Sequence, residues 1–493
     1  MFCVDTSTQT NERYKCVDVP PQLASIIVEP HRISLPLLVV SVCLLFLGSL
    51  DDGIAGQLAL ICWLMTVLPL ALLEPGGAFG MYVASVALFS GSMRNLVGHS
   101  SVIERPDEYA FLLLVAGLTI VGLQRSHATC ISRFTIIVAA FLAYGLPHLL
   151  LVGFPSRTAF AGFSRCYGTV CISALLWWAA PTIKELRSFA LITTILGVHM
   201  SGVSLLEALH WHSLIFPKWI ADPALNSNIA ETIGSGRSGG LLMQAEFNGA
   251  ALGLIACIIW AWIRLGDTSV KAPKYAALIL CAAGMYFTYT RAAWLGAVGA
   301  FLILLLYKLR SEQDQRKATA WVITTVCVAA SLAIIPDHRA SERLGDSANG
   351  YFRLNLWTGG LKMAAERPLF GYGVGQFSTN ITSYHDESGL IPFTPIDDEG
   401  TVAHNTLINI LTEEGLVGLI LYLAIIVVLY QRTRRSATLT WGNAGAAWVS
   451  ATCLLFVINM QFVVAYEPTN NLLLFGTLGM IAGLRRNNIP VLT

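Results

Sequence analysis

One apolar run, residues 275–307, reads YAALILCAAGMYFTYTRAAWLGAVGAFLILLLY and contains a single charged residue, Arg291. A straight α-helix of that length would measure about 50 Å. The hydrocarbon core of a bilayer is only about 30 Å thick, and about 20 apolar residues are enough to cross it. The run therefore predicts two consecutive membrane-crossing helices joined by a tight turn near Arg291.

The composition of the whole chain supports this interpretation. Of its 493 residues, 55% are hydrophobic and 12% are charged, whereas soluble domains average about 25% charged residues. So low a charge content excludes a soluble enzyme, a secreted disulfide scaffold, a fibrous protein and a disordered protein, and leaves a polytopic membrane protein. The net charge of +1 gives no sign of a nucleic-acid partner. The eleven cysteines lack C-x-x-C spacing, and we interpret them as small apolar residues.

Apolar runs along the chain predict an all-α bundle of about 12–14 membrane-crossing helices. Several runs are short, so the predicted number of fourteen carries an uncertainty of two. The predicted spans lie at residues 33–50, 55–73, 77–92, 109–124, 134–152, 167–182, 188–207, 240–263, 274–290, 292–308, 318–335, 405–430, 443–465 and 469–484.

Basic residues in alternate loops indicate how this bundle is oriented. Because Lys and Arg concentrate in cytoplasmic loops, we expect these loops and the polar tail 1–32 on the cytoplasmic side. Arg94, Arg105, Arg157 and Arg165 lie in loops assigned to the outside and are exceptions. The predicted cytoplasmic set is Arg125, Arg133, Lys184, Arg187, Arg264, Lys271, Lys274, Lys308, Arg310, Arg316, Lys317, Arg432, Arg434, Arg435, Arg485 and Arg486.

The largest predicted loop covers residues 336–404 and falls on the outside. It holds five Lys or Arg and nine Asp or Glu. Loops of this length are usually functional or disordered. Four apolar residues recur in it at helical spacing, namely Leu354, Trp357, Leu361 and Ala365. We therefore expect part of the loop to be a helix that lies on the membrane surface.

The junction of this loop with the next span carries a motif, His404-Asn405 followed by Gly415 and Gly418. On a continuous helix Gly415 would return to within about 20° of His404, and Gly418 to within about 40°. This spacing predicts a histidine above a groove floored by glycines, which let a lipid chain or backbone approach closely. The alternative is a His-Asn helix cap and a packing seam of small residues.

Three arginines near the outer surface are candidate phosphate ligands. Arg291 could bind a diphosphate or simply extend to the lipid headgroups. Arg353 precedes the amphipathic stretch, and its alternative is a solvated loop arginine. Arg367 opens the segment RPLFGYGVGQF, for which the solvated alternative is stronger. The G-x-G-x-G spacing there lacks the strand–helix context of a nucleotide-binding loop, so we interpret it as a series of turns.

Carboxylates complete the candidate set. Glu246 and Glu414 lie at the edge of or inside predicted spans, where each could orient His404 or a bound sugar, or make a structural contact between helices. An acidic cluster close to His404 could hold a divalent cation, although such clusters are usually just solvated. This cluster consists of Asp386, Glu387, Asp397, Asp398 and Glu399.

Taken together, residues 275–425 resemble the O-antigen ligase and polymerase superfamily. The His-Asn-x9-Gly-x-x-Gly pattern of the ligases is matched by His404, Asn405, Gly415 and Gly418. Arg291 resembles the family's arginine at the outer end of a span, and Arg353 resembles the family's arginine at the start of an amphipathic outer-loop helix. The Pro-x-x-Gly-x-Gly-x-Gly-x-Phe segment that ends at Phe377 is also family-like.

The resemblance implies a membrane enzyme that acts at the periplasmic face of the bacterial inner membrane. Its donor would be a glycan on undecaprenyl diphosphate, and its acceptor another glycan or a lipid A core, with no metal or other cofactor. His404, Arg291 and Arg353 would be catalytic. Further polysaccharide assembly proteins are possible partners. The residues expected to bind substrate are Asn405, Gly415, Gly418, Glu246, Glu414 and Arg367.

Ligases and polymerases share these motifs, so the resemblance does not separate the two, and the first half of the chain matches no family motif. Two further departures from the family pattern concern the Arg353 assignment and the number of spans. Trp357 stands where the family often has leucine four residues after the arginine, so the match of Arg353 is weaker than that of His404. The fourteen predicted spans exceed the twelve typical of ligases, and this number alone favours a polymerase slightly. The implied domains are a cytoplasmic tail 1–32, a transmembrane bundle 33–273, a catalytic region 274–430 that includes loop 336–404, and a C-terminal transmembrane hairpin 431–493.

Two other functions remain as alternatives. A transporter or flippase for lipid-linked glycans would need polar groups near the membrane midplane and related halves. In this chain the candidate functional residues gather at the outer face, and the sequences of the two halves are not related to each other. Both observations favour an enzyme. A scaffold subunit of a polysaccharide export complex would tolerate loss of His404, Arg291 and Arg353 individually.

Overall fold

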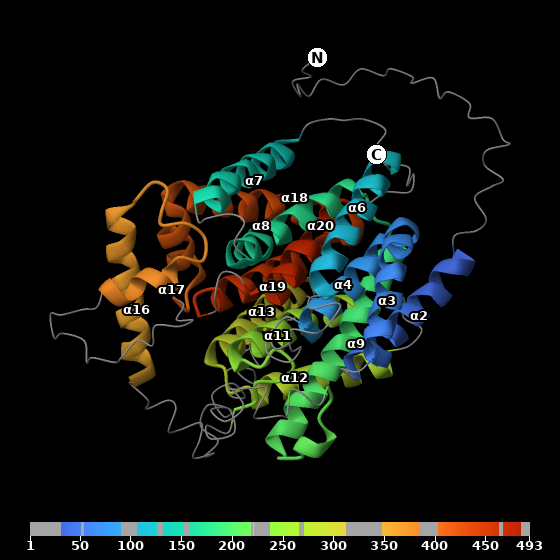
Figure 1. Cartoon of the computed structure of the whole chain (residues 1–493). Helices are drawn as coiled ribbons and strands as arrows, with labels where there is room; N and C mark the ends of the chain where they lie inside the picture. The colour runs from blue at the N-terminus through green and yellow to red at the C-terminus, as the bar shows by residue number, and fades with distance from the viewer. Residues whose placement is uncertain are drawn as a thin grey trace.

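The computed structural model describes residues 31–50, 54–89, 106–125, 132–151, 157–217, 220, 237–265, 271–311, 348–384, 403–462 and 467–484. All regular structure in these ranges is helical (Figure 1). The first part comprises α2 (His31–Leu50), α3 (Ile54–Leu73), α4 (Pro75–Phe89), α6 (Pro106–Arg125), α7 (Arg133–Leu151), α8 (Arg157–Trp178), α9 (Ile183–Ala208) and η1 (His212–Leu214). The second comprises α11 (Ala245–Leu265), α12 (Ala272–Phe287), α13 (Arg291–Ser311), α16 (Ala348–Glu366), α17 (Phe377–Asn380), η3 (Ile381–Tyr384), α18 (Thr406–Asn459), α19 (Pro468–Asn471), η4 (Leu472–Gly476) and α20 (Thr477–Ala482).

Five of the described helices are long and apolar enough to cross a membrane, judged by length and composition, and six shorter ones are also apolar. This confirms the prediction of an all-α, polytopic membrane protein. The predicted span 318–335 and residues 1–30 of the predicted tail lie outside the described residues. The five long helices are Ala55–Leu73, Pro106–Arg125, Ile183–Ala208, Ala245–Arg264 and Thr406–Asn459.

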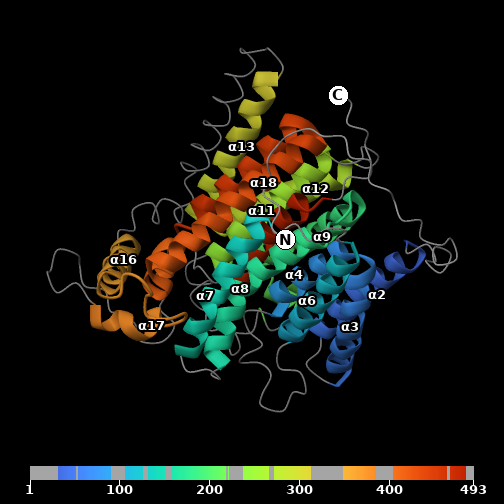
Figure 2. The same ribbon diagram turned by 90° about the horizontal axis from the view of Figure 1, so that it is seen from above.

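The predicted break at Arg291 is present. Helix α12 ends at Phe287 and α13 begins at Arg291, so only Thr288–Thr290 join them, with Tyr289 in the left-handed region (φ 48°). The turn is closed by the Thr288 hydroxyl, which donates to the carbonyl of Met285 at 2.8 Å. Helix α13 then packs along the last part of α18, which Figure 2 shows beside it.

Helix α18 differs from the prediction of two spans joined by a basic loop at Arg432–Arg435. Those arginines are helical, and the backbone leaves helical geometry at Gly415 and at Gly442 instead. The physical reason is that residues 419–441 contain neither glycine nor proline, so nothing in that stretch ends the helix. Both breaks combine positive φ with extended ψ (67°, −171° and 65°, −157°), a combination that is nearly exclusive to glycine.

The chain from Pro468 to Ala482, which covers most of the predicted last span 469–484, forms the centre of the bundle. It comprises α19, a π-helical turn η4 and α20, and its apolar side chains are almost fully buried. Glu467 caps it by accepting hydrogen bonds from the backbone N–H groups of Thr469 and Asn470. A side chain at Gly476 would collide with the ring of Phe79, so the end of η4 and α4 approach closely at this position.

Helices α16 and α17 stand beyond one end of the bundle with a small core of their own (Figure 2). The predicted helix in the outer loop is therefore present, and a face other than the predicted apolar stripe packs against the rest of the protein. Leu354 and Leu361 remain 43% and 50% exposed. The packed face consists of Leu356, Gly359, Gly360 and Met363, because the glycines allow Ile381 and Ile408 to approach the helix. Contact of the exposed stripe with a membrane surface stays a prediction.

Candidate functional site

Charged side chains from three separate parts of the chain meet at one end of the bundle, which we call the site end. It is where α11, α13 and α18 begin and where α9 and α12 end. Backbone hydrogen bonds fix this meeting: Ser238 N–H donates to Phe287 at 3.0 Å, and Thr406 N–H donates to Met460 at 2.8 Å. The N-terminal end of α16 contributes Arg353.

Two arginines share one carboxylate oxygen at the site end. Oε1 of Glu246 lies 3.0 Å from Nη2 of Arg237 and 3.5 Å from Nη2 of Arg353. Burial lowers the pKa of Arg353, and the charges of Arg237 and Arg291 lower it further, while Glu246 opposes them. Arg291 therefore belongs to the same group. We call Arg237, Arg291, Arg353, Glu246 and His404 the charge cluster.

Arg237 also ties the charge cluster to the turn between α12 and α13. Its Nε donates to the carbonyl of Thr288 at 3.2 Å, and its Nη2 donates to the hydroxyl of Thr290 at 3.2 Å. Thr290 directly precedes Arg291. One guanidinium group thus contacts both the carboxylate of Glu246 and the backbone that positions Arg291, which couples the placement of the two arginines.

The segment that carries Arg237 is fastened to the end of α9 by a buried carboxylate. Oε2 of Glu207 accepts from the hydroxyl of Ser238 at 2.6 Å and from the N–H of Gly240 at 2.8 Å. Gly240 has a left-handed backbone (φ 58°), and a side chain there would collide with Asn248. The segment therefore has a fixed backbone path, and Arg237 is positioned by a structural contact outside the charge cluster.

His404 lies next to the arginines, immediately before α18. Its backbone is left-handed (φ 46°), and its Nδ1 atom is buried with no hydrogen-bond partner among the described residues. Burial lowers the pKa of His404 below its usual value, and the charge of Arg353 lowers it further, while Glu246 acts in the opposite direction. The imidazole is therefore neutral near pH 7 and available to accept a proton.

Asn405 caps α18 rather than facing the charge cluster. Its Oδ1 atom accepts from the N–H groups of Leu407 and Ile408 at 3.0 and 3.1 Å, and its Nδ2 donates to Gln461 at 3.4 Å. This is the geometry of a helix N-cap. The cap fixes where the helix starts and hence where His404 stands, so Asn405 positions the histidine. A contact between Asn405 and substrate stays a prediction.

The predicted glycine groove below His404 is wrong in its geometry, because α18 does not continue as a helix through Gly415. The carbonyl of Leu369 occupies the position that a side chain at Gly415 would need, and the N–H of Leu416 donates to Pro368 at 2.8 Å. Gly418 instead packs against Glu414 and Tyr144. Gly415 thus lets the outer-loop backbone approach α18, and Gly418 lets Tyr144 of α7 approach it, as expected for the alternative of a packing seam of small residues.

The glycine-rich segment 367–377 and the break at Gly415 form one structural unit. The N–H groups of Tyr372 and Gly373 donate to the carbonyls of Thr412 and Glu413 at 3.0 and 2.8 Å. Gly371, Gly373 and Gly375 all have positive φ. The two motifs that are far apart in sequence therefore pair with each other, and together they attach the outer loop to the bundle.

Replacing Gly415 by alanine is expected to destabilise the protein by more than about 2 kcal/mol, because the backbone conformation is nearly exclusive to glycine and the added methyl group meets backbone atoms. The thermal unfolding midpoint in detergent should fall. Gly202→Ala is the matched control, since nothing lies within 4 Å of its Cβ position, and its midpoint should stay level or rise. Equal midpoints for the two variants would contradict this role of Gly415.

Glu414 lies apart from His404 and contacts α7 and α8 instead. Its Oε2 accepts from the hydroxyl of Tyr167 at 2.8 Å, and its Oε1 lies 3.4 Å from Sγ of Cys166. Its backbone carbonyl accepts from the hydroxyl of Tyr144 at 2.5 Å. Glu414 therefore makes a structural contact between helices, which was the alternative to a role beside His404. Glu246 is the carboxylate that lies with the arginines and His404.

Arg367 lies at the far end of α16 from the charge cluster. Arg353 and Glu366 are thirteen positions apart on that helix, which corresponds to about 20 Å. The Arg367 guanidinium stacks on the ring of Tyr372 at 4.3 Å and is exposed to solvent. Beside it, the hydroxyls of Tyr372 and Tyr384 donate to Glu366 at 2.9 and 2.5 Å. A role of Arg367 in substrate binding would therefore be at a distance from His404.

The predicted acidic cluster at residues 386–399 lies outside the described residues. Among the residues that the structure describes, no group of three His, Cys, Asp or Glu side chains is placed to hold a metal ion. Cation binding by the acidic cluster thus stays an alternative drawn from the sequence.

Arg237 is the residue of the charge cluster that the sequence motifs did not reveal. A signal was present, because Arg237 is a basic residue directly before a predicted span on the side assigned to the outside. Basic residues on that side run against the positive-inside rule, and such exceptions often have a specific role.

Comparison with known protein families gives one match. Residues 276–423 match the family described as O-antigen ligase. The matched stretch contains Arg291, Arg353 and His404 and ends before the basic stretch at Arg432, while Arg237 and Glu246 precede it. No curated protein matches the chain. The resemblance inferred from the motifs is thus confirmed over somewhat less than a third of the chain.

Proposed function

We propose that this chain, which carries an O-antigen ligase domain, transfers a glycan from undecaprenyl diphosphate to a sugar hydroxyl at the periplasmic face of the inner membrane. The observation that carries the proposal is the charge cluster, in which Arg237 and Arg353 share the carboxylate of Glu246 while Arg291 and a neutral His404 lie close enough to Arg353 to interact with its charge. Arginine forks bind phosphate oxygens with paired, charge-assisted hydrogen bonds.

The proposed transfer requires that the diphosphate leaving group is stabilised and that the proton of the acceptor hydroxyl is removed. The acceptor oxygen bonds to the anomeric carbon of the donor while the bond from that carbon to the phosphate oxygen breaks. The electron pair leaves with polyprenyl diphosphate, whose growing negative charge the arginines stabilise. The neutral imidazole of His404 takes the proton of the acceptor hydroxyl. The energy comes from the donor's phosphate bond, so no step requires a metal or a nucleotide.

Glu246 has a different role in this scheme. Without substrate, the carboxylate of Glu246 holds Arg237 and Arg353 near each other although their charges repel. Its Oε1 atom lies 3.0 Å from Nη2 of Arg237 and 3.5 Å from Nη2 of Arg353. A diphosphate brings its own negative charges to the arginines. Glu246 therefore preorganises the phosphate site and offsets part of the effect of Arg353 on His404.

The position of the charge cluster supports a periplasmic reaction. It lies at the site end, whereas Lys184 and Arg187 lie at the beginning of α9, and Arg264 at the end of α11, at the opposite end of the bundle. Since basic residues concentrate on the cytoplasmic side, the site end faces the periplasm in our proposal. A lipid-linked donor in the outer leaflet would present its diphosphate at that level.

The same position favours a transferase over a flippase. A flippase requires charged groups near the membrane midplane and a repeat whose halves move against each other. The arginines instead gather at the site end, at the level where our proposal places the diphosphate of the donor. The other buried carboxylates near the site end form structural links. Glu207 accepts from the hydroxyl of Ser238 in the segment before α11, and Glu414 accepts from the hydroxyl of Tyr167 on α8.

Arg237→Gln is expected to lower transfer about ten- to a hundredfold, because Glu246 loses its closest cation and the turn before Arg291 loses two hydrogen bonds. Initial rates of glycan transfer in reconstituted vesicles, compared per folded molecule, measure the effect. Arg125→Gln is the matched control, since it breaks another partly buried Arg–Glu pair, with Glu185, at the opposite end. If both variants transfer equally, Arg237 has only a structural role.

A reconstitution experiment separates the two acceptor types. Purified protein in lipid vesicles receives a lipid-linked oligosaccharide in the presence of EDTA, and a gel resolves the products. A ladder from the donor alone indicates a polymerase, and a single transfer that requires lipid A core indicates a ligase. No transfer with either acceptor in EDTA, followed by activity after a divalent cation is added, would contradict the metal-free scheme.

A further inference from the structure

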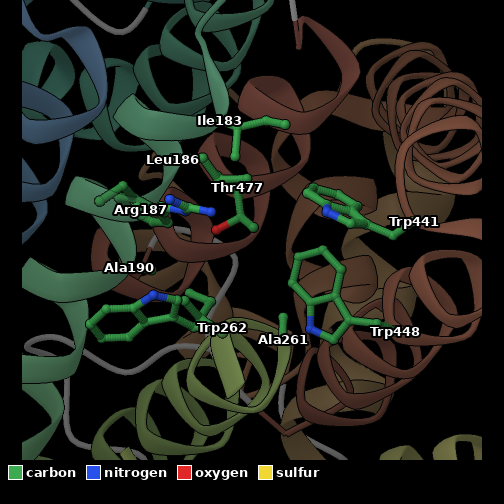
Figure 3. Close-up of a pocket in the computed structure, with 11 residues that line it drawn as sticks. Ile183, Leu186, Arg187, Ala190, Ala261, Trp262, Trp441, Trp448 and Thr477 are labelled. Atoms are coloured by element: carbon green, nitrogen blue, oxygen red, sulfur yellow. The ribbon is translucent and has the colours of Figure 1, made fainter. Parts of the chain in front are cut away.

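A pocket lined by tryptophans opens at the end of the bundle opposite the charge cluster. It lies between the first turns of α9, the end of α11, the second break of α18 and α20 (Figure 3). Its volume is about 60 Å³, which is enough for part of a hydrocarbon chain but too small for a whole lipid molecule. We call it the tryptophan pocket. Its lining residues are Ile183, Leu186, Arg187, Phe189, Ala190, Ile258, Ala261, Trp262, Trp441, Trp448 and Thr477.

The helix break at Gly442 produces this pocket. Because the backbone turns there, Trp441 and Trp448 come to lie on one side of the cavity, with Trp262 of α11 opposite them (Figure 3). The indole N–H of Trp448 is satisfied by the carbonyl of Cys257 at 2.7 Å. The Trp262 ring carries the ammonium group of Lys274 at 4.3 Å. The walls are therefore apolar and held in place by contacts outside the cavity.

One cation enters this apolar cavity. Figure 3 shows the guanidinium group of Arg187 extending into the pocket toward the side chain of Thr477. Two carboxylates close to this turn of α9 are engaged elsewhere. Glu185, two positions before Arg187, pairs with Arg125 at 2.8 Å, and Glu74 accepts a hydrogen bond from the neighbouring Ser188. Within the described ranges Arg187 forms no ion pair. It is thus available to a negatively charged ligand.

We propose that the tryptophan pocket binds an anionic phospholipid of the cytoplasmic leaflet, with the lipid phosphate on Arg187 and one acyl chain between Trp262 and the tryptophans of α18. Charge complementarity selects this occupant, because an arginine fork pairs with phosphate and apolar walls accept hydrocarbon. Tryptophan and basic residues at helix ends are also placed at the level of lipid headgroups. The site is independent of the charge cluster and of the proposed transfer reaction.

Native mass spectrometry of the full-length protein tests this assignment. The protein is released from nanodiscs that contain phosphatidylglycerol and phosphatidylcholine, and retained lipid adducts are counted. Arg187→Gln should weaken retention of phosphatidylglycerol about tenfold, and Arg187→Lys should restore part of it. The matched control is Arg434→Gln, an exposed arginine of α18 that does not line the pocket, which should retain lipid like the wild type.

A second variant tests the apolar part of the site. Trp262→Ala should lower retention of both phosphatidylglycerol and phosphatidylcholine, because it removes part of the acyl-chain site while Arg187 remains. Glycan transfer by this variant shows that the protein is folded. Three results would overturn the proposal: equal retention of the two lipids by the wild type, equal loss in Arg187→Gln and Arg434→Gln, or retention unaffected by both pocket variants. Preferential retention of a polyprenyl phosphate over phosphatidylglycerol would also overturn it.

Discussion

Replacing His404 by alanine lowers glycan transfer by about a hundred- to ten-thousandfold, the usual contribution of a general base. The expectation follows from its surroundings, because the imidazole lies beside Arg353 and Glu246 and is kept neutral by burial and by the adjacent cation. Binding of the lipid-linked donor should change little, since the arginines that bind phosphate remain. The measurements are the single-turnover rate of transfer and the retention of donor by the purified variant.

His210→Ala is the matched control for this variant. His210 shares the left-handed backbone of His404 (φ 59° and 46°) but follows the end of α9 and belongs to no part of the charge cluster. The control separates loss of a catalytic base from the conformational effect of substituting a left-handed histidine. If His404→Ala transfers glycan at the wild-type rate, or if His210→Ala loses as much, His404 is not the base.

Replacing Arg353 by glutamine should lower the rate of transfer about a hundred- to a thousandfold, because one of the groups that stabilise the leaving diphosphate is lost. It should also move the pH profile. The charge of Arg353 lowers the pKa of His404, so without it this pKa rises toward the ordinary value. Since the base must be neutral, the rate falls on acidification through this pKa, and the acidic limb of the profile moves to higher pH.

The rate of transfer measured against pH in wild type and variant checks both effects. Arg353→Lys should recover part of the rate and keep the acidic limb near its wild-type position, because a point charge remains but the paired hydrogen bonds do not. The control is Lys362→Gln, which removes an exposed cation from the same helix. A slower Arg353→Gln with an unshifted acidic limb would mean that Arg353 and His404 do not interact.

The sequence was informative where a length or a charge sets a physical limit. The run 275–307 is too long to cross a bilayer once, so the break at Arg291 could be predicted, and α12 and α13 confirm it. The helix of the outer loop was predictable from periodicity, yet its packed face was not. Apolar residues form two stripes on α16, and the position of Gly359 and Gly360 decides which stripe is buried.

The glycines of α18 show what a helical wheel cannot reveal. The spacing predicts Gly415 below His404 only if the helix is unbroken between them. Gly415 instead adopts a conformation that ends the helix, and the partner that makes this break favourable, segment 367–373, lies more than forty residues earlier. Arg237 was missed for a similar reason, since its relation to Glu246 and Thr290 depends on the packing of three helix ends.

The central claim is that the charge cluster transfers glycan rather than moving it across the membrane. Its most direct test uses vesicles that contain only the purified chain and a labelled undecaprenyl-diphosphate oligosaccharide with an acceptor glycan. The quantity measured is free undecaprenyl diphosphate released per glycan joined. We predict equal release and transfer by the wild type, with neither by His404→Ala. Movement of intact donor between leaflets, with no diphosphate released and no difference in the variant, would contradict the account.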